Sequence, residues 1–200
     1  PFTQGDAVRS VTINRGTATG GSGKTSRLSS MAPAASLSAR PGEAVTITCI
    51  GPAGGAVYAE VAGKSVTLTQ VAAADTGVPA KFKAEVVIPE EKFVAGEVTS
   101  LGQISYTLVY NGETKNYKST GVVFAIGDGA KLAIRANCNL AGIEPQPETT
   151  GSFTATLRTG CADYVVEETE DWYGLSMGGY IKKAHSTPVT GGGDVQNSIT

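Results

Sequence analysis

The sequence is poor in the residues on which most catalytic chemistry depends. Its 200 residues contain one histidine, three cysteines and one tryptophan. A zinc centre needs two or three protein ligands as well as a general base, so a chain whose one histidine is His185 lacks a zinc hydrolase's ligand set. A Cys–His nucleophile would require His185 to reach Cys161 across the fold. We therefore expect no catalytic residue, no metal ion and no cofactor.

Charge and long apolar runs are also scarce. Charged residues make up 17% of the chain and the formal net charge is −2, so no strong field attracts nucleic acid or an anionic lipid surface. No apolar stretch approaches the roughly 20 residues that a membrane helix needs. We expect neither nucleic-acid binding nor membrane insertion. The 40% of apolar residues still indicates a folded chain rather than a disordered one.

Both ends of the sequence look cut rather than natural. The sequence opens Pro1-Phe2-Thr3-Gln4 without the basic and apolar regions of an export signal, so any such signal has been removed or lies upstream. Residues 187–200 contain three consecutive glycines and little to bury, which predicts a flexible linker or tail. We expect a segment of a longer protein.

The patterns that are present predict an all-β fold. Helical periodicity is nearly absent, whereas alternation of apolar and polar residues recurs between glycine and proline turns. Only Pro89–Glu97 could form a helical turn. Seven short strands at this spacing predict an antiparallel immunoglobulin-like β-sandwich over residues 1–127. The predicted strands are Ala7–Asn14, Ala44–Ile50, Ala56–Val61, Ser65–Val71, Ala80–Ile88, Leu101–Tyr110 and Tyr117–Ile126.

The strongest local pattern is the dipeptide Asn111-Gly112 between two alternating runs. Both residues tolerate the positive φ of a type I′ turn, which joins strands through a two-residue loop. Such a loop pairs Tyr110 with Glu113 and sets Tyr106 opposite Tyr117. A cross-strand aromatic pair of this kind contributes up to about 1 kcal/mol and fixes the register. Gly63 predicts a second tight hairpin.

The composition changes after Ile126. Residues 1–127 carry 11 basic and 9 acidic side chains, whereas residues 128–200 carry 5 and 9. Gly127-Asp128-Gly129 marks the joint. Residues 128–186 predict a small SH3-like β-barrel, with strands at Lys131–Asn137, Gly151–Arg158, Asp163–Glu168, Trp172–Ser176 and Tyr180–Lys183.

The cysteines leave the redox compartment open. Cys49 lies in an alternating run and is expected to be a buried apolar residue. Cys138 and Cys161 could form a disulfide, which would stabilise a domain this small by about 3 kcal/mol and indicate an extracellular location. The alternative is two unrelated thiols.

One nucleotide motif is rejected. Residues 18–25 read ATGGSGKT and satisfy a loose phosphate-loop pattern. The motif requires a following helix and belongs to a parallel α/β sheet. Here Pro33 and several serines follow, so we expect a flexible glycine–serine loop.

The segment Thr156–Ala184 holds the candidate binding residues. Four of the chain's thirteen aromatic residues fall within 17 positions, beside several acidic residues. An aromatic groove with acidic neighbours suits a peptide or glycan that carries free amines. We expect Trp172 or Tyr180 to be at least partly buried. The alternative is a barrel core beside a solvated acidic turn. The groove candidates are Tyr164, Trp172, Tyr173, Tyr180, Asp163 and Glu168.

This segment resembles a known family of small domains. The succession is similar to the bacterial SH3-like domains of cell-wall hydrolases, in the residues Leu157, Gly160, Val165, Val166, Trp172, Leu175, Gly179, Tyr180 and Ile181. With the preceding sandwich, the chain resembles the non-catalytic region upstream of the catalytic domain in N-acetylmuramoyl-L-alanine amidases of Gram-positive bacteria. The segments that carry this resemblance are NRGTATG, SLSARPGEAVTITC, STGVVFAIGDGAKL and DYVVEETEDWYGLSMGGYIKKA.

The resemblance implies a secreted, cell wall-associated protein. Its partners would be a peptidoglycan stem peptide or glycan and an adjoining catalytic domain outside this chain. We therefore expect a non-catalytic region that targets or positions a wall hydrolase on peptidoglycan. The alternatives are a surface adhesin, a protein–protein interaction module and a structural spacer.

Overall fold

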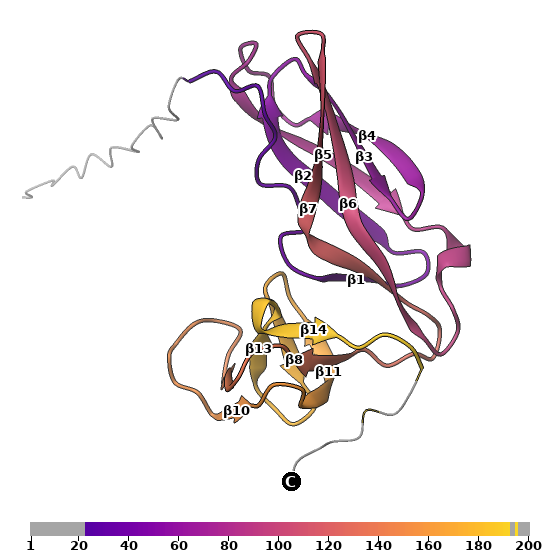
Figure 1. Cartoon of the computed structure of the whole chain (residues 1–200), viewed down its shortest axis with the longest axis vertical. Helices are drawn as coiled ribbons and strands as arrows, with labels where there is room; N and C mark the ends of the chain where they lie inside the picture. Colours follow the sequence, from indigo (N-terminus) through magenta and orange to yellow (C-terminus); the bar gives the residue numbers. More distant parts are fainter. Residues whose placement is uncertain (1–22, 193–194, 196–200) are drawn as a thin grey trace, which may run out of the picture.

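The structure of the protein, a computed structural model, describes residues 23–192 and 195. It consists of strands and two single-turn 3-10 helices, arranged as two β-domains stacked end to end (Figure 1). No α-helix occurs among the described residues. The all-β fold class predicted from the alternation and the turn residues is confirmed.

The first domain is a seven-stranded sheet with the order β1-β7-β6-β3-β4-β5-β2. All its pairs are antiparallel except β1 with β7, which is parallel and departs from the antiparallel prediction. The short chain before β1 joins the two edges, because Ser29 bridges to Ile50 of β2 and the Gly121 N–H of β7 donates to the Pro33 carbonyl. The sheet therefore curls nearly into a closed barrel. Its strands are β1 (Leu37–Ala39), β2 (Ala44–Pro52), β3 (Ala56–Val61), β4 (Lys64–Gln70), β5 (Pro79–Val87), β6 (Val98–Tyr110) and β7 (Glu113–Ile126).

Alternation along the strands produces the first core. In β2 the buried residues Val45, Ile47 and Cys49 alternate with more exposed neighbours, as a strand with one face inward requires. Tyr106 is fully buried, and its hydroxyl donates a hydrogen bond to the Ala32 carbonyl. This bond holds the segment before β1 against the sheet, because a buried hydroxyl needs a partner.

The β6–β7 hairpin has the predicted turn and register. Asn111 and Gly112 both have positive φ, at 51° and 76°. Tyr110 pairs with Glu113, and Tyr106 pairs with Tyr117. The turn chemistry of two residues therefore decided the pairing of the two longest strands, because a hairpin of this turn type has a fixed loop length.

The lower part of this hairpin leaves the first core and enters the second. Register shifts near Gly102 and Ile104 bend the hairpin, and Ser119 accepts the Ile104 N–H at 2.9 Å there. Beyond the bend, Val98, Phe124 and Ile126 pack with the core of the second domain. Because the two domains share these side chains, the junction near residue 127 is a packed contact and not a free linker.

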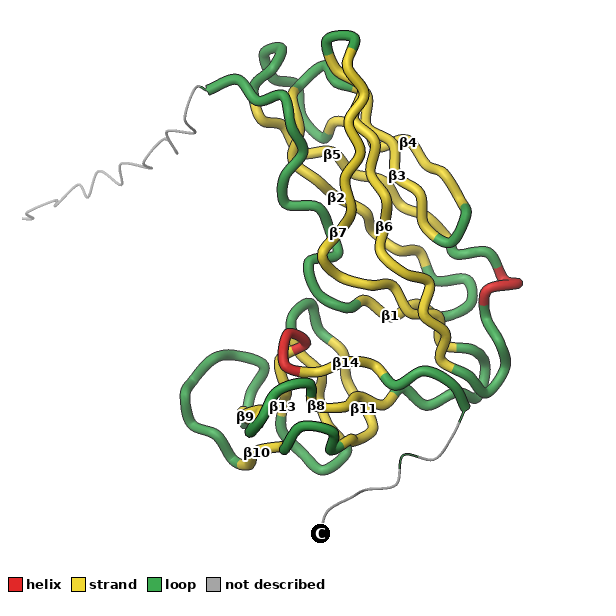
Figure 2. Tube along the Cα trace, viewed as in Figure 1, coloured by secondary structure: helices red, strands yellow, loops and turns green. Residues whose placement is uncertain are grey.

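The second domain is also a seven-stranded sheet, in the order β10-β9-β13-β12-β11-β8-β14 (Figure 2). Its core includes Ile134, Ile143, Tyr173 and Ile181, all with 0% of their surface exposed. Asp163 closes one turn, because its carboxylate accepts hydrogen bonds from the Ser176 hydroxyl and the Met177 N–H. The strands are β8 (Ala133–Ala136), β9 (Ala141–Glu144), β10 (Ala155–Leu157), β11 (Ala162–Glu168), β12 (Trp172–Leu175), β13 (Tyr180–Lys182) and β14 (Ser186–Pro188).

The differences from prediction are mostly short strands. β1, β9 and β14 have three or four residues, too few to show a repeating pattern. Residues 187 and 188, predicted to begin a flexible tail, lie in β14 instead because they pair with β8. The helical turn predicted within Pro89–Glu97 is the 3-10 turn η1 (Glu90–Lys92). The predicted strand Ala7–Asn14 lies outside the described residues.

Candidate functional site

The six predicted groove residues do not meet in one place. Trp172 and Tyr173 are adjacent on β12 and both are buried, whereas Tyr164 and Tyr180 are partly exposed. Asp163 is buried and holds the turn at Ser176 and Met177, which is a structural role. The predicted aromatic groove is therefore divided between the core, a turn and the outer surface.

Tyr180 and Trp172 make polar contacts within the second domain. The Tyr180 hydroxyl donates to the Glu167 carboxylate at 2.8 Å, and this bond raises the pKa of Tyr180 because it favours the neutral phenol. The Lys182 ammonium lies 5.3 Å from the centre of the Trp172 ring. Both aromatic residues therefore have partners within the second domain.

Glu168 and Tyr173 lie instead where the two domains meet. One carboxylate oxygen of Glu168 accepts the Lys183 ammonium at 2.7 Å and the Ser38 N–H at 3.3 Å. Ser38 belongs to β1 of the first domain, so Glu168 connects the domains directly. The Lys183 side chain is 2% exposed and its ammonium also lies 4.9 Å from the Tyr173 ring centre. The predicted residue Glu168 is thus a contact between domains.

This contact contains polar atoms without partners. The Tyr173 hydroxyl and Ser38 Oγ are buried, and neither makes a well-formed hydrogen bond with the described residues. Burial raises the pKa of Tyr173, the Glu168 carboxylate adds to that rise, and the nearby hydroxyls of Ser38 and Ser36 oppose it. Unsatisfied buried polar groups are rare in native folds, so this pair of hydroxyls calls for a physical explanation.

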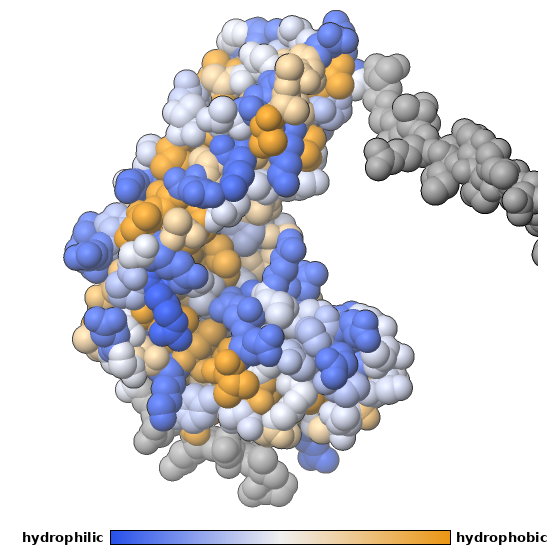
Figure 3. Space-filling model, turned by 180° about the vertical axis from the view of Figure 1, so that it is seen from behind, coloured by the Kyte–Doolittle hydropathy of each residue, from blue (hydrophilic) through white to orange (hydrophobic). Residues whose placement is uncertain are grey.

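A cleft opens on both sides of this contact. Figure 3 shows a deep hollow between the two domains, with hydrophilic residues around its rim. The larger cavity has a volume of about 970 Å³ and the smaller one about 270 Å³. Ser38, Glu43 and Glu168 line both cavities, so the contact between the domains divides the cleft in two.

The larger cavity is lined by hydroxyl and charged side chains together with an apolar stretch, Met31–Ala35 and Leu37, of the chain up to β1. It lies between the chain before β1, the outer face of β2 and the β11–β12 turn. Hydroxyls bind sugars and peptides through hydrogen bonds in either direction, and charges of both signs suit a ligand with ammonium and carboxylate groups. The hydroxyl residues are Ser30, Ser36, Ser38, Thr46, Thr48, Thr120 and Thr169, and the charged ones are Glu43, Lys81, Glu168, Glu170, Asp171 and Lys183.

The Cys49 thiol and His185 lie apart from the cleft. Burial raises the pKa of the Cys49 thiol to about 11, so it is protonated and unreactive at neutral pH. His185 is exposed in the 3-10 turn η2 (Lys183–His185), and it lines neither cavity. No cluster of three metal-ligating side chains is present among the described residues.

Of the two alternatives for Cys138 and Cys161, the structure shows thiols and no disulfide between them. Cys138 and Cys161 are both partly buried and pack against the same second core. The core against which they pack also includes side chains of β6 and β7. The segment of the chain that the structure describes contains no helix long and apolar enough to cross a membrane.

Comparisons with known protein families, with curated proteins and with solved structures gave no match to this chain.

Sequence reasoning missed most of the cleft residues. No sequence motif includes Ser36, Ser38 or Lys183. They come together because β1 pairs with β7 at the end of the first sheet that faces the second domain (Figure 1). The sequence feature that could have indicated the cleft is the acidic turn of Glu167, Glu168, Glu170 and Asp171. From the sequence, this turn is predicted to lie beside a barrel groove or in solvent.

Proposed function

We propose that the protein is a non-catalytic binding module that holds peptidoglycan in the cleft between its domains, as part of a secreted wall hydrolase or its positioning region. The observation that supports this best is the cavity of about 970 Å³ with hydroxyl and charged side chains from both domains. Its volume falls in the range of roughly 300–1,000 Å³ that is usual for ligand sites.

The shared core supports a binding role for the cleft. Val98, Phe124 and Ile126 of the first domain pack in the second core, which holds the two walls of the cleft at a set spacing. A site whose walls do not have to close on the ligand loses less conformational entropy on binding. A glycan with peptide branches, which has hydroxyls, charges and apolar faces, matches a cleft lined by hydroxyl, charged and apolar side chains.

Sedimentation with purified sacculi tests the proposal. We expect wild-type protein to be retained well above an unrelated β-sandwich. Thr46→Trp, which places a large ring in the cleft, should lower retention about tenfold, because even one blocked contact of about 1.4 kcal/mol has that effect.

Two control variants sharpen the result. Thr67→Trp changes an equally exposed strand residue on β4, outside both cavities, and should bind like wild type. Tyr180→Ala tests the aromatic surface of the second domain and should also leave retention unchanged. If the wild type is retained no better than the unrelated sandwich, the proposal is wrong.

A rigid spacer or adhesin is the second candidate, and the shared core favours it as well. Two domains that pack through common side chains keep a constant distance between their ends. A spacer predicts one interdomain distance by small-angle scattering, together with no retention of any variant on sacculi. Retention that depends on Thr46 contradicts the spacer.

A further inference from the structure

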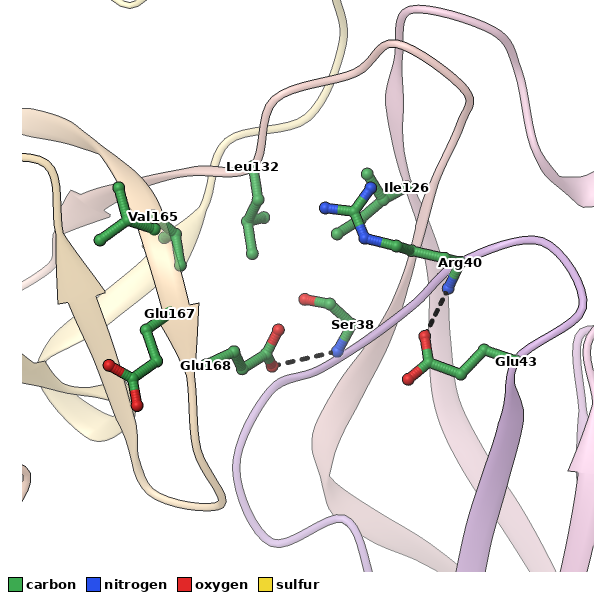
Figure 4. Close-up of a pocket in the computed structure, with 9 residues that line it drawn as sticks. Ser38, Arg40, Glu43, Ile126, Leu132, Val165, Glu167 and Glu168 are labelled. Carbon is green, nitrogen blue, oxygen red and sulfur yellow. Dashed lines mark hydrogen bonds between the residues drawn. The ribbon is translucent and has the colours of Figure 1, made fainter.

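The smaller cavity, on the other side of the Ser38–Glu168 contact, has features that the larger one lacks. Figure 4 shows it between the β1–β2 turn of the first domain and β11 of the second. One wall is apolar and consists of Ile126, Leu132 and Val165, which belong to the second core or pack against it. Its volume of about 270 Å³ is just below the usual range for ligand sites and suits a single amino-acid side chain.

The charged groups of this cavity stand at two different places. The Arg40 side chain extends over the cavity toward Ile126, and the carboxylates of Glu43 and Glu168 lie on either side of Ser38 (Figure 4). Glu167 also lines the cavity, and its carboxylate already accepts the Tyr180 hydroxyl. The Arg40 guanidinium has no salt bridge with any described residue. An exposed guanidinium beside an apolar wall is suited to bind a carboxylate with two parallel hydrogen bonds.

The carboxylates of Glu43 and Glu168 each accept hydrogen bonds from the described residues through only one of their two oxygens. Glu43 accepts the Arg40 backbone N–H through Oε2 at 3.0 Å, and Glu168 accepts its two partners through Oε1. In each case the second oxygen has no hydrogen bond from the described residues. Ser38 Oγ is buried beside the Tyr173 hydroxyl, so the second oxygens of Glu43 and Glu168 are the acceptors that a ligand would reach. These acceptors together suit a ligand ammonium group, which has three donors.

We propose that this cavity binds the zwitterionic end of an aliphatic amino-acid side chain, with its carboxylate on Arg40 and its ammonium between Glu43 and Glu168. This inference rests on the proposed function: the chain that carries the group is a peptidoglycan stem peptide whose diamino acid ends in both charges. The polymer lies along the cleft, and its side chain enters the smaller cavity beside the contact between Ser38 and Glu168. A ligand that carries a carboxylate but no ammonium group would be repelled by Glu43 and Glu168.

Calorimetric titration with three disaccharide-tripeptides tests the inference on the full chain. The first contains meso-diaminopimelate, the second its side-chain carboxamide, and the third its N-acetylated amine. We expect the first to bind about tenfold more tightly than either derivative, because each lost charge-assisted hydrogen bond costs about that factor.

Variants assign each charge to its residue. Arg40→Gln should abolish the preference for the carboxylate over the carboxamide, and Glu43→Gln should abolish the preference for the free amine over its acetylated form. Arg158→Gln and Glu113→Gln remove exposed charges outside both cavities and should keep both preferences. Glu168 is left unchanged because it also connects the domains.

The outcomes separate this inference from the function on which it rests. Equal affinity for the three ligands, with sacculi still retained through the cleft, overturns the inference and leaves the proposed function in place. Loss of retention on sacculi as well overturns both. Tight binding of free meso-diaminopimelate with the same two charge preferences, but without retention on sacculi, supports the cavity as an amino-acid site and contradicts its link to the wall.

Discussion

The ion pair between Lys183 and Glu168, within the second domain, holds the carboxylate that contacts Ser38 of the first domain, and it permits the sharpest test of the packing at this junction. The Lys183 side chain is 2% exposed and Glu168 is 24% exposed, and their charged atoms lie 2.7 Å apart. Lys183→Met keeps most of the side-chain volume but leaves the Glu168 carboxylate without its cation. Breaking a buried ion pair from one side costs roughly 3–5 kcal/mol.

Two features of the structure adjust this magnitude. Water reaches part of Glu168, which lowers the penalty, whereas the Lys183 ammonium also interacts with the Tyr173 ring, which adds to it. We therefore expect a loss of about 3 kcal/mol in the free energy of unfolding. For a chain of this length that corresponds to a fall of roughly 10 °C in Tm.

Urea denaturation followed by far-UV circular dichroism measures the loss. The matched control is Lys83→Met, because Lys83 and Glu85 also lie 2.8 Å apart but are 46% and 59% exposed. An exposed pair contributes less than about 1 kcal/mol. The double variant Lys183→Met/Glu168→Gln should recover about 1–3 kcal/mol, since it removes the uncompensated charge. The reasoning is refuted if Lys183→Met costs no more than Lys83→Met.

Three further predictions follow from the packing. Phe124→Ala should lower the free energy of unfolding by about 3–5 kcal/mol, because Phe124 packs in the second core. Circular dichroism and the fluorescence of the single tryptophan should still report one common unfolding transition. Two separate transitions in the wild type would contradict the shared core. Gly121→Ala should destabilise strongly in thermal melts, since its Cβ would clash with the Ala35 carbonyl, whereas Gly23→Ala meets nothing and should be neutral. Stability should fall as pH rises from 9 to 11, because the Cys49 pKa is raised from 9.0 to about 11 in the fold: the unfolded thiol ionises first and favours unfolding. Cys49→Ala should flatten that part of the pH profile in urea titrations, and an unchanged slope would contradict the assignment.

The long strands were predictable because their information is local. Asn111 and Gly112 decide a two-residue turn, and the alternation on either side decides which face is buried, so the register of β6 and β7 could be predicted. β1 could not, because three residues show no periodicity, and its parallel pairing depends on Pro33 and Gly121 far apart in the chain.

The site was less predictable than the fold. Trp172 and Tyr173 form the aromatic pattern that suggested a groove, yet both lie in or beside the core, since large apolar rings are buried unless something keeps them out. Glu168 was selected for its charge, but what that carboxylate does depends on Ser38, which lies 130 residues away along the chain.

The sequence alone determined the strand-rich fold, its tight hairpins and the scarcity of catalytic groups, because turn preference, alternation and residue content act within a few neighbouring positions. The tertiary structure decided that the end of one hairpin completes the second core, and that a cleft forms beside Ser38 and Glu168. These features arise from contacts between distant segments, where the burial of Phe124 or Lys183 depends on what the rest of the chain places against it.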